Sequence, residues 1–162
     1  MNHLYAPWRT NYVTQSEESS QSQQCPFCIS PDQYDDEKNF IIKRFENAYV
    51  MLNKYPYNAG HLLIIPYAHK ASLEFLSSQE RAEIMEIMTT ALQILQKVLK
   101  NQGTNIGINV GGKAAGGSVP DHLHWHAVPR FLGDTNFLPI LAQTKSISLD
   151  LHDLYKKLKG AF

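Results

Sequence analysis

Three histidines alternate with apolar residues in the stretch His122-Leu123-His124-Trp125-His126-Ala127-Val128. Because successive side chains of a β-strand point to opposite faces, the pattern predicts a strand from His122 to Val128. The three imidazoles would then line one face of the strand, and the apolar side chains between them would pack on the other. Three imidazoles make a poor hydrophobic core, so we expect this face to carry a functional site.

A loop of small residues comes directly before the predicted strand, Gly111-Gly112-Lys113-Ala114-Ala115-Gly116-Gly117-Ser118. Small residues such as Gly117 let backbone N–H groups approach a phosphate closely, and the Ser118 hydroxyl can add a hydrogen bond. Neutral imidazole is a nucleophile near neutral pH because its unperturbed pKa is about 6.5. His124 is the best placed of the three to attack phosphorus, with His126 beside it. Loop and strand together indicate a site that binds and attacks a phosphate.

The composition is that of a soluble globular protein, with 43% hydrophobic and 19% charged residues. Lys plus Arg balances Asp plus Glu at 15 each, so no global positive field attracts nucleic acid or an acidic membrane. At 162 residues we expect a single domain over 1–162. There is no long apolar run and no signal-peptide segment at the start, which predicts a cytoplasmic protein.

Residue periodicity predicts an α+β chain. Beside the histidine strand, β-formers predict strands at 40–45, 48–53, 61–65 and 104–110, the first two as an antiparallel hairpin. Ser77 and Glu80 form a capping box for a long helix that runs to about Lys100, and a final helix is expected from about Leu149 to Lys159. The polar segment 14–24 is predicted to be a flexible surface loop.

The chain has two cysteines, in Cys25-Pro26-Phe27-Cys28. In a reducing compartment this spacing is typical of a zinc site or a redox pair, and no thioredoxin-like context surrounds it. His69 and His122 are sensible third and fourth ligands of a closed tetrahedral site. A competing interpretation places a catalytic zinc on the three alternating histidines instead.

The run from His122 to Val128 resembles the signature of the histidine triad (HIT) superfamily. The stretches Asn109–Ser118 and Pro129–Phe137 also resemble its bacterial and fungal branch, which includes diadenosine tetraphosphate phosphorylases and related dinucleoside polyphosphate hydrolases. The resemblance implies a HIT-like α+β fold, with a mostly antiparallel sheet of about five strands, a long packed helix and a C-terminal helix. It also implies a homodimer.

The resemblance further implies roles for individual residues. His124 would be the nucleophile that takes up a nucleotidyl group, and His126 would contact phosphate oxygens near the scissile bond. Zinc-containing relatives join a Cys-x-x-Cys pair to a middle histidine and the first triad histidine, here Cys25, Cys28, His69 and His122, as a structural site. The remaining implied contacts are with the α-phosphate (Gly117, Ser118, Asn109), the ribose (Asn53) and the base (Phe40, Ile41, Leu52).

The expected function is cleavage of the α-phosphate linkage of a dinucleoside polyphosphate, such as diadenosine tetraphosphate, or of a similar nucleotide ester. The reaction would pass through a covalent nucleotidyl-histidine, with no organic cofactor. Hexose-phosphate uridylyltransferases carry Gln at the third triad position, so the retained His126 argues against that activity. Two alternatives stay open, a zinc hydrolase with three histidine ligands and a non-catalytic nucleotide-binding protein. His61, at the start of a strand, is assigned a structural role.

Overall fold

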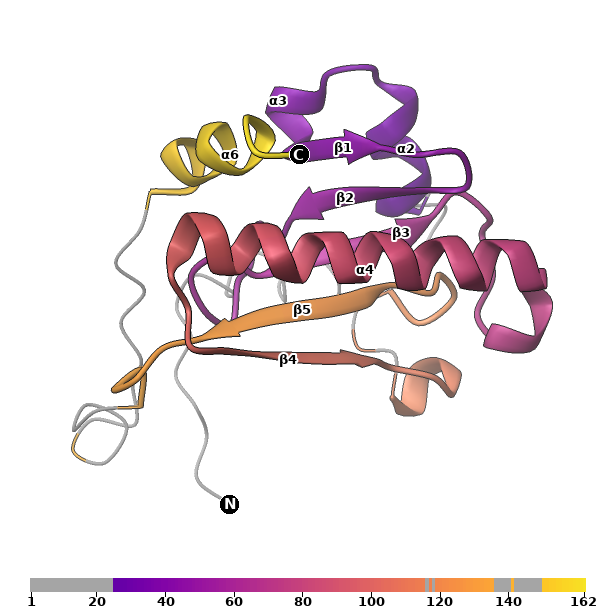
Figure 1. Cartoon of the computed structure of the whole chain (residues 1–162). Coiled ribbons are helices and arrows are strands. Elements are labelled where there is room, and N and C mark those ends of the chain that lie inside the picture. Colours follow the sequence, from indigo (N-terminus) through magenta and orange to yellow (C-terminus); the bar gives the residue numbers. More distant parts are fainter. Residues whose placement is uncertain (1–24, 116, 118, 136–140, 142–149) are drawn as a thin grey trace.

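The computed structural model of this chain describes residues 25–115, 117, 119–135, 141 and 150–162 (Figure 1). The predicted loop at 14–24 and the predicted phosphate contact Ser118 lie outside the described residues.

Five antiparallel strands form one sheet in the order β1-β2-β3-β5-β4. This confirms the predicted α+β fold with a five-stranded sheet. The strands β1, β2 and β3 form a meander, and β5 inserts between β3 and β4. Their bounds are Ile41–Arg44 (β1), Ala48–Leu52 (β2), Leu62–Pro66 (β3), Gly103–Ile108 (β4) and Trp125–Arg130 (β5).

One face of the sheet is covered by the long helix α4 (Ser78–Leu99), with α6 (Leu151–Lys159) beside it (Figure 1). The predicted capping box is present: the Glu80 N–H donates to the Ser77 hydroxyl at 3.1 Å, and the Ser77 N–H donates to the Glu80 carboxylate at 2.7 Å. Apolar residues at helical spacing face the sheet, and each fully buried aliphatic side chain stabilises the fold by about 1.5–3 kcal/mol. The buried ones on α4 are Ile84, Ile87, Met88, Ala91, Ile94 and Leu95. Of the described helices, none has the length and apolarity to cross a membrane.

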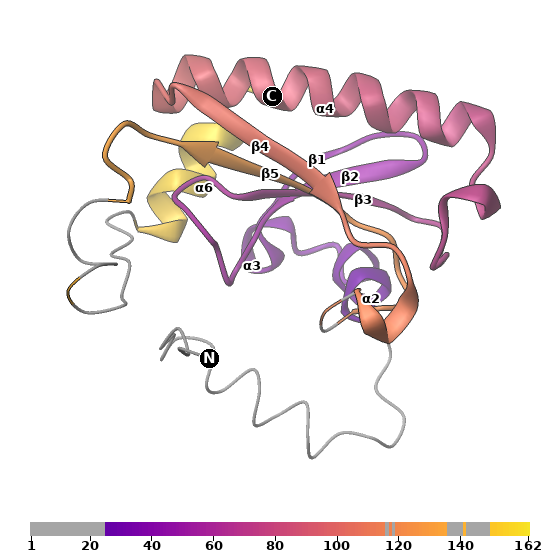
Figure 2. The same cartoon turned by 90° about the horizontal axis from the view of Figure 1, so that it is seen from below.

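The opposite face of the sheet carries α2 (Pro26–Asp32) and α3 (Asp36–Asn39), as Figure 2 shows. A smaller apolar cluster lies here, and Phe27 of α2 packs against it. The Tyr49 hydroxyl donates to the Phe27 carbonyl at 2.7 Å, which attaches α2 to β2. The cluster consists of Ile41, Tyr49, Met51, Leu63 and Ile65.

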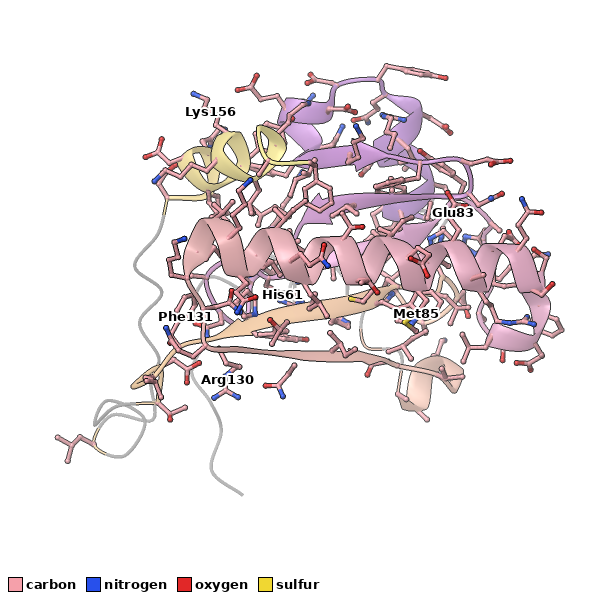
Figure 3. All side chains as sticks on the ribbon, in the orientation of Figure 1. His61, Glu83, Met85, Arg130, Phe131 and Lys156 are labelled. Carbon is pink, nitrogen blue, oxygen red and sulfur yellow. The ribbon has the colours of Figure 1, made fainter. Side chains whose placement is uncertain are left out.

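The long helix also holds the turn between β1 and β2. Glu83 of α4 points toward this turn (Figure 3), where its carboxylate accepts the Asn47 side-chain amide at 2.5 Å and the Glu46 N–H at 3.0 Å. Hairpin and helix are therefore joined by charge-assisted hydrogen bonds as well as by the core.

The histidine strand was predicted to begin at His122, and this boundary is wrong. Regular pairing with β3 and β4 begins only at Trp125. The backbone before Trp125 forms a hydrogen bond outside the sheet: the Leu123 N–H donates to the Lys70 carbonyl at 2.7 Å. The side chains nevertheless still alternate: Leu123 and Ala127 lie in the core under α4, and Trp125 packs against it.

Other element ends also differ from the predictions, by one or two residues. The third strand begins at Leu62, after a turn in which the His61 N–H donates to the Asn58 carbonyl at 3.2 Å. The fourth strand ends at Ile108 rather than residue 110. The last helix begins at Leu151, because the Asp150 carboxylate accepts the first free N–H groups of that helix.

Candidate functional site

The His124 imidazole lies on the α2 side of the sheet with its protonation pattern set by the backbone. Its Nδ1 lies 2.8 Å from the carbonyl oxygen of His122, so Nδ1 carries the hydrogen and donates it. The other ring nitrogen, Nε2, is left with a free lone pair. Burial lowers the pKa of His124 below its ordinary value, which favours the neutral ring. A neutral imidazole with an unprotonated Nε2 is a competent nucleophile.

His126 lies beside it, with the two ring centroids 5.0 Å apart. Its tautomer is set by a chain of hydrogen bonds that starts at the backbone of Tyr57. The Tyr57 N–H donates to Nδ1 of His61 at 3.1 Å, so this nitrogen is an acceptor and the proton of His61 is on Nε2. That Nε2 donates to Nδ1 of His126 at 2.9 Å. The proton of His126 is therefore on its Nε2.

The Nε2 of His126 is buried and has no hydrogen-bond partner within the described part of the chain. A buried N–H without an acceptor costs free energy, so such a group marks a place where a ligand atom can be accommodated. The arrangement offers one lone pair, on His124, and one N–H donor, on His126, from adjacent rings.

Burial keeps the His61 and His126 rings of this hydrogen-bond chain uncharged. Desolvation, together with the neighbouring His126 and His124, lowers the pKa of His61 to about 3. Desolvation and then His124 lower the pKa of His126 to about 4. Both rings are therefore neutral near pH 7, as the chain of donors and acceptors requires.

Four predicted metal ligands meet next to these rings. The ligand atoms of Cys25, Cys28, His69 and His122 all lie within 4.8 Å of one another. The Cys25 Sγ is 3.3 Å from Nδ1 of His122, and the Cys28 Sγ is 3.3 Å from Nδ1 of His69. Typical Zn–S and Zn–N bond lengths in a tetrahedral site separate sulfur and nitrogen ligands by about 3.5 Å. The cluster can bind a metal ion.

The protonation of His122 also fits a metal ligand. Its Nε2–H donates to the Pro66 carbonyl at 2.8 Å, so the lone pair of Nδ1 faces the two sulfur atoms. Burial and the neighbouring Cys25 raise the pKa of the Cys28 thiol to about 11, whereas a redox-active cysteine needs a lowered pKa. The raised pKa does not favour the redox interpretation, and the lone pair of His122 Nδ1 that faces both sulfur atoms favours a metal site.

Of the other predicted substrate contacts, some lie near the histidine rings or at the surface and others are buried in the core. The Asn53 side-chain amide lies 3.2 Å from Nδ1 of His61, which brings Asn53 into the site. Asn109 is exposed just after β4, and Gly117 has a positive φ of 60° that suits glycine. Of the three predicted base contacts, Phe40 is 8% exposed and the other two, Ile41 and Leu52, are fully buried. In this conformation a base could contact Ile41 or Leu52 only after neighbouring side chains moved.

Three residues beside His124 and His126 were not predicted as part of the site from the sequence. His61 belongs to the hydrogen-bond chain of His126, although its position at a strand start suggested only a structural role. The exposed Tyr57 ring stacks on His126 at 5.9 Å, and Phe27 contacts His124 at 4.9 Å. The one available signal was His61 itself, a histidine at the start of the otherwise apolar segment 61–65 that was predicted as a strand.

Comparison with known proteins identifies the family. The HIT domain model matches residues 35–133. A curated relative, the AP-4-A phosphorylase of Mycobacterium tuberculosis, is 38% identical over 98% of this chain and 83% of its own length. The asymmetrical bis(5'-nucleosyl)-tetraphosphatase of Schizosaccharomyces pombe is 31% identical over 58% of this chain and 50% of its own length.

A solved structure, a Zn-bound histidine triad family protein from Mycobacterium smegmatis, has a TM-score of 0.68 at 28% identity, covering 85% of this chain and 92% of that one. The family match, the sheet order and the triad geometry agree, and the chain belongs to the HIT domain family.

Proposed function

We propose that this protein is a nucleotidyl hydrolase or transferase that cleaves the α-phosphate linkage of dinucleoside polyphosphates such as diadenosine tetraphosphate. The observation that carries the proposal is the hydrogen bond from Nδ1 of His124 to the His122 carbonyl, because it leaves Nε2 free to attack phosphorus. The similarity to an AP-4-A phosphorylase along nearly the whole chain supports this class of substrate.

In the proposed first step, His124 Nε2 forms a bond to the α-phosphorus, and the bond from that phosphorus to the bridging oxygen breaks. The leaving nucleotide departs with the bridging oxygen, and the nucleotidyl group stays on His124. In the second step water or inorganic phosphate attacks the same phosphorus and releases the nucleotide from the ring. Dividing one displacement into two in this way lowers the barrier of each.

His126 would stabilise the negative charge that develops in both steps. Its Nε2–H has no described partner, so it can donate to a phosphate oxygen or to the leaving oxygen. The hydrogen bond from His61 keeps this proton on Nε2. We propose that Gly117, Ser118 and Asn109 contact the α-phosphate, that Asn53 contacts the ribose, and that Phe40, Ile41 and Leu52 form the apolar slot for the base. These contacts remain predictions.

For the metal cluster we propose zinc in a structural role. Two thiolates and two imidazoles are the ligand set of closed structural zinc sites, and such a site would fix α2 to the segment that carries His122. When bound, zinc would supply a cross-link between these segments. A reducing cytoplasm, the proposed location, keeps both thiols available as ligands.

The zinc-hydrolase alternative is less well supported. Within the described residues, the group of three or more ligand side chains close enough to share an ion is this cluster, and it includes only one triad member. His126 would have to change its tautomer to join such a site, because its Nδ1 accepts a hydrogen bond from His61 and its Nε2 carries the proton.

We also propose that the enzyme is a homodimer in which two copies of β4 pair. β4 lies at one edge of the sheet, and its side chains are largely exposed, including Ile106 at 52%. The opposite edge, β1, is packed by α3 and α6. Unpaired backbone N–H and C=O groups at a sheet edge favour pairing with a second strand. A two-fold axis would give both copies of β4 the same hydrogen bonds. Light scattering should therefore detect a dimer that Ile106→Asp dissociates, whereas Tyr34→Asp, at an even more exposed ring near β1, leaves it intact.

Product analysis with diadenosine tetraphosphate, with and without inorganic phosphate, tests the proposed function. ADP and ATP that form only with phosphate indicate a phosphorylase, and AMP and ATP in plain buffer indicate an asymmetric hydrolase. Tight AMP binding with no turnover of any dinucleoside polyphosphate would contradict the proposal and favour a binding protein.

A further inference from the structure

The aromatic ring between the two cysteines touches the proposed nucleophile. The Phe27 ring centroid lies 4.9 Å from that of His124, with the planes tilted by 56°. The same ring meets His122 edge-on at 5.7 Å. Both separations fall in the range of favourable aromatic pairs. Phe27 therefore contacts a predicted metal ligand and the proposed nucleophile at the same time.

The contact with Phe27 restrains the orientation of the His124 ring, which hydrogen bonding alone does not fix. Within the described residues, His124 is held by one hydrogen bond, from Nδ1 to the His122 carbonyl. A single bond at one ring atom lets the plane pivot about that atom, and the lone pair of Nε2 would move with it. Contact with the Phe27 ring opposes this pivot. In-line attack on phosphorus depends on the direction of that lone pair.

The position of Phe27 depends in turn on the cysteines. Phe27 lies two residues after Cys25 and directly before Cys28, at the start of α2. The Tyr49 hydroxyl holds its backbone carbonyl, and its ring packs on the apolar cluster under α2. An ion that joins both sulfur atoms to His69 and His122 would fix this short segment at both ends.

We infer that Phe27 is a positioning residue, which orients the imidazole of His124 for attack and links that orientation to the Cys25/Cys28 metal site. The inference rests on the proposed function. It assigns Phe27 no contact with substrate. Its loss should therefore slow the bond-forming step without weakening nucleotide binding.

The test compares Phe27→Leu, which removes the ring, with Phe27→Tyr, which keeps it, in the metal-loaded protein. Single-turnover quenching measures how fast the nucleotidyl-histidine forms, AMP titration measures binding, and elemental analysis measures metal content. We expect Phe27→Leu to slow adduct formation about tenfold with AMP affinity and metal content unchanged, because small misplacements of a reacting atom cost this much or more. Phe27→Tyr should stay within about twofold of the wild type.

Tyr67→Leu is the matched control. Tyr67 also packs on the apolar cluster under α2, and its ring stacks on Tyr49 at 5.4 Å rather than on a histidine. It should leave the rate of adduct formation unchanged. A wild-type rate in Phe27→Leu, or equal slowing in Tyr67→Leu or Phe27→Tyr, would overturn the inference. Should Phe27→Leu lose its metal or unfold, Phe27→Met fills the space with a flexible side chain and is judged by the same criterion.

Imidazole NMR separates this inference from the proposed function. In the wild type His124 should show a single tautomer with the proton on Nδ1, and in Phe27→Leu its signals should broaden or report a mixture. Unchanged His124 signals in Phe27→Leu would overturn the positioning role even if the wild type formed no nucleotidyl adduct. Absence of the adduct in the wild type would overturn the proposed function alone.

Discussion

Nε2 of His61 and Nδ1 of His126 lie 2.9 Å apart, although 65 residues separate them in the chain. The Tyr57 N–H at one end of this pair determines where both protons are. A second backbone group, the His122 carbonyl, determines the proton of His124. The lone pair and the N–H donor of the proposed site are therefore both specified by the main chain.

Replacing His61 should impair catalysis through His126. His61→Leu removes the donor to His126, so His126 can take the other tautomer and withdraw its proton from the site. We expect kcat/KM to fall about 10²-fold, as for loss of a proton donor. His61→Gln retains an N–H donor and should keep most of that activity. Steady-state kinetics on the two variants checks this, and equal activities would show that the hydrogen bond has no part in the reaction.

The same pair should make stability depend on pH. In the folded protein the pKa of His61 is about 3 and that of His126 about 4, against 6.5 ordinarily, so the unfolded chain binds more protons between about pH 6.5 and 3. Stability is thus full above pH 6.5 and decreases as the pH falls through this window. Urea unfolding at a series of pH values should show a shallower dependence for His61→Gln than for the wild type. Parallel curves would contradict the lowered pKa of His61.

Local signals in the sequence predicted the five strands and the helices α4 and α6, but not the short helices α2 and α3. The start of α4 was correct because a capping box acts within three residues, between Ser77 and Glu80. The start of the histidine strand was wrong because a distant group, the Lys70 carbonyl, takes the N–H of Leu123. Alternation of side chains survives such a change of partner, which is why the faces of the triad were predicted correctly and the boundary was not.

Metal should contribute to stability and should act on the chemistry only through the position of Phe27, without taking part in a chemical step. Cys25→Ser should lower the metal content and reduce Tm by on the order of 10 °C, because metal binding contributes to folding free energy. His124→Ala should keep the metal and lose turnover. Elemental analysis and calorimetry check both variants. A Cys25→Ser protein with unchanged metal content would show that this cluster is not the binding site.

Gly60, which directly precedes His61, should tolerate no side chain. Its φ is +81°, and a Cβ there would lie 3.2 Å from the Pro129 ring and press on Leu99 of α4. We expect Gly60→Ala to cost about 1–3 kcal/mol of unfolding free energy. Gly107→Ala is the control, because nothing lies within 4 Å of its Cβ and its φ is not positive. Chemical denaturation of both variants checks this, and equal stabilities would contradict the assigned backbone strain.

The site was only partly predictable from the sequence. The metal ligands could be proposed because a Cys-x-x-Cys pair needs partners and the family resemblance points to His69 and His122. The partner of His61 could not be found this way, because the pairing of β3 with β5 brings it to His126 and no spacing along the chain encodes that pairing. The contact of Phe27 with His124 was hidden for the same reason.

During turnover, Nε2 of His124 should bond covalently to phosphorus. Mass spectrometry of peptides from the enzyme quenched during turnover of diadenosine tetraphosphate tests this bond. We expect a nucleotidyl group on the peptide that contains His124, which forms as fast as turnover requires and is absent in His124→Ala. Turnover without this adduct, or an active His124→Ala enzyme, would contradict it.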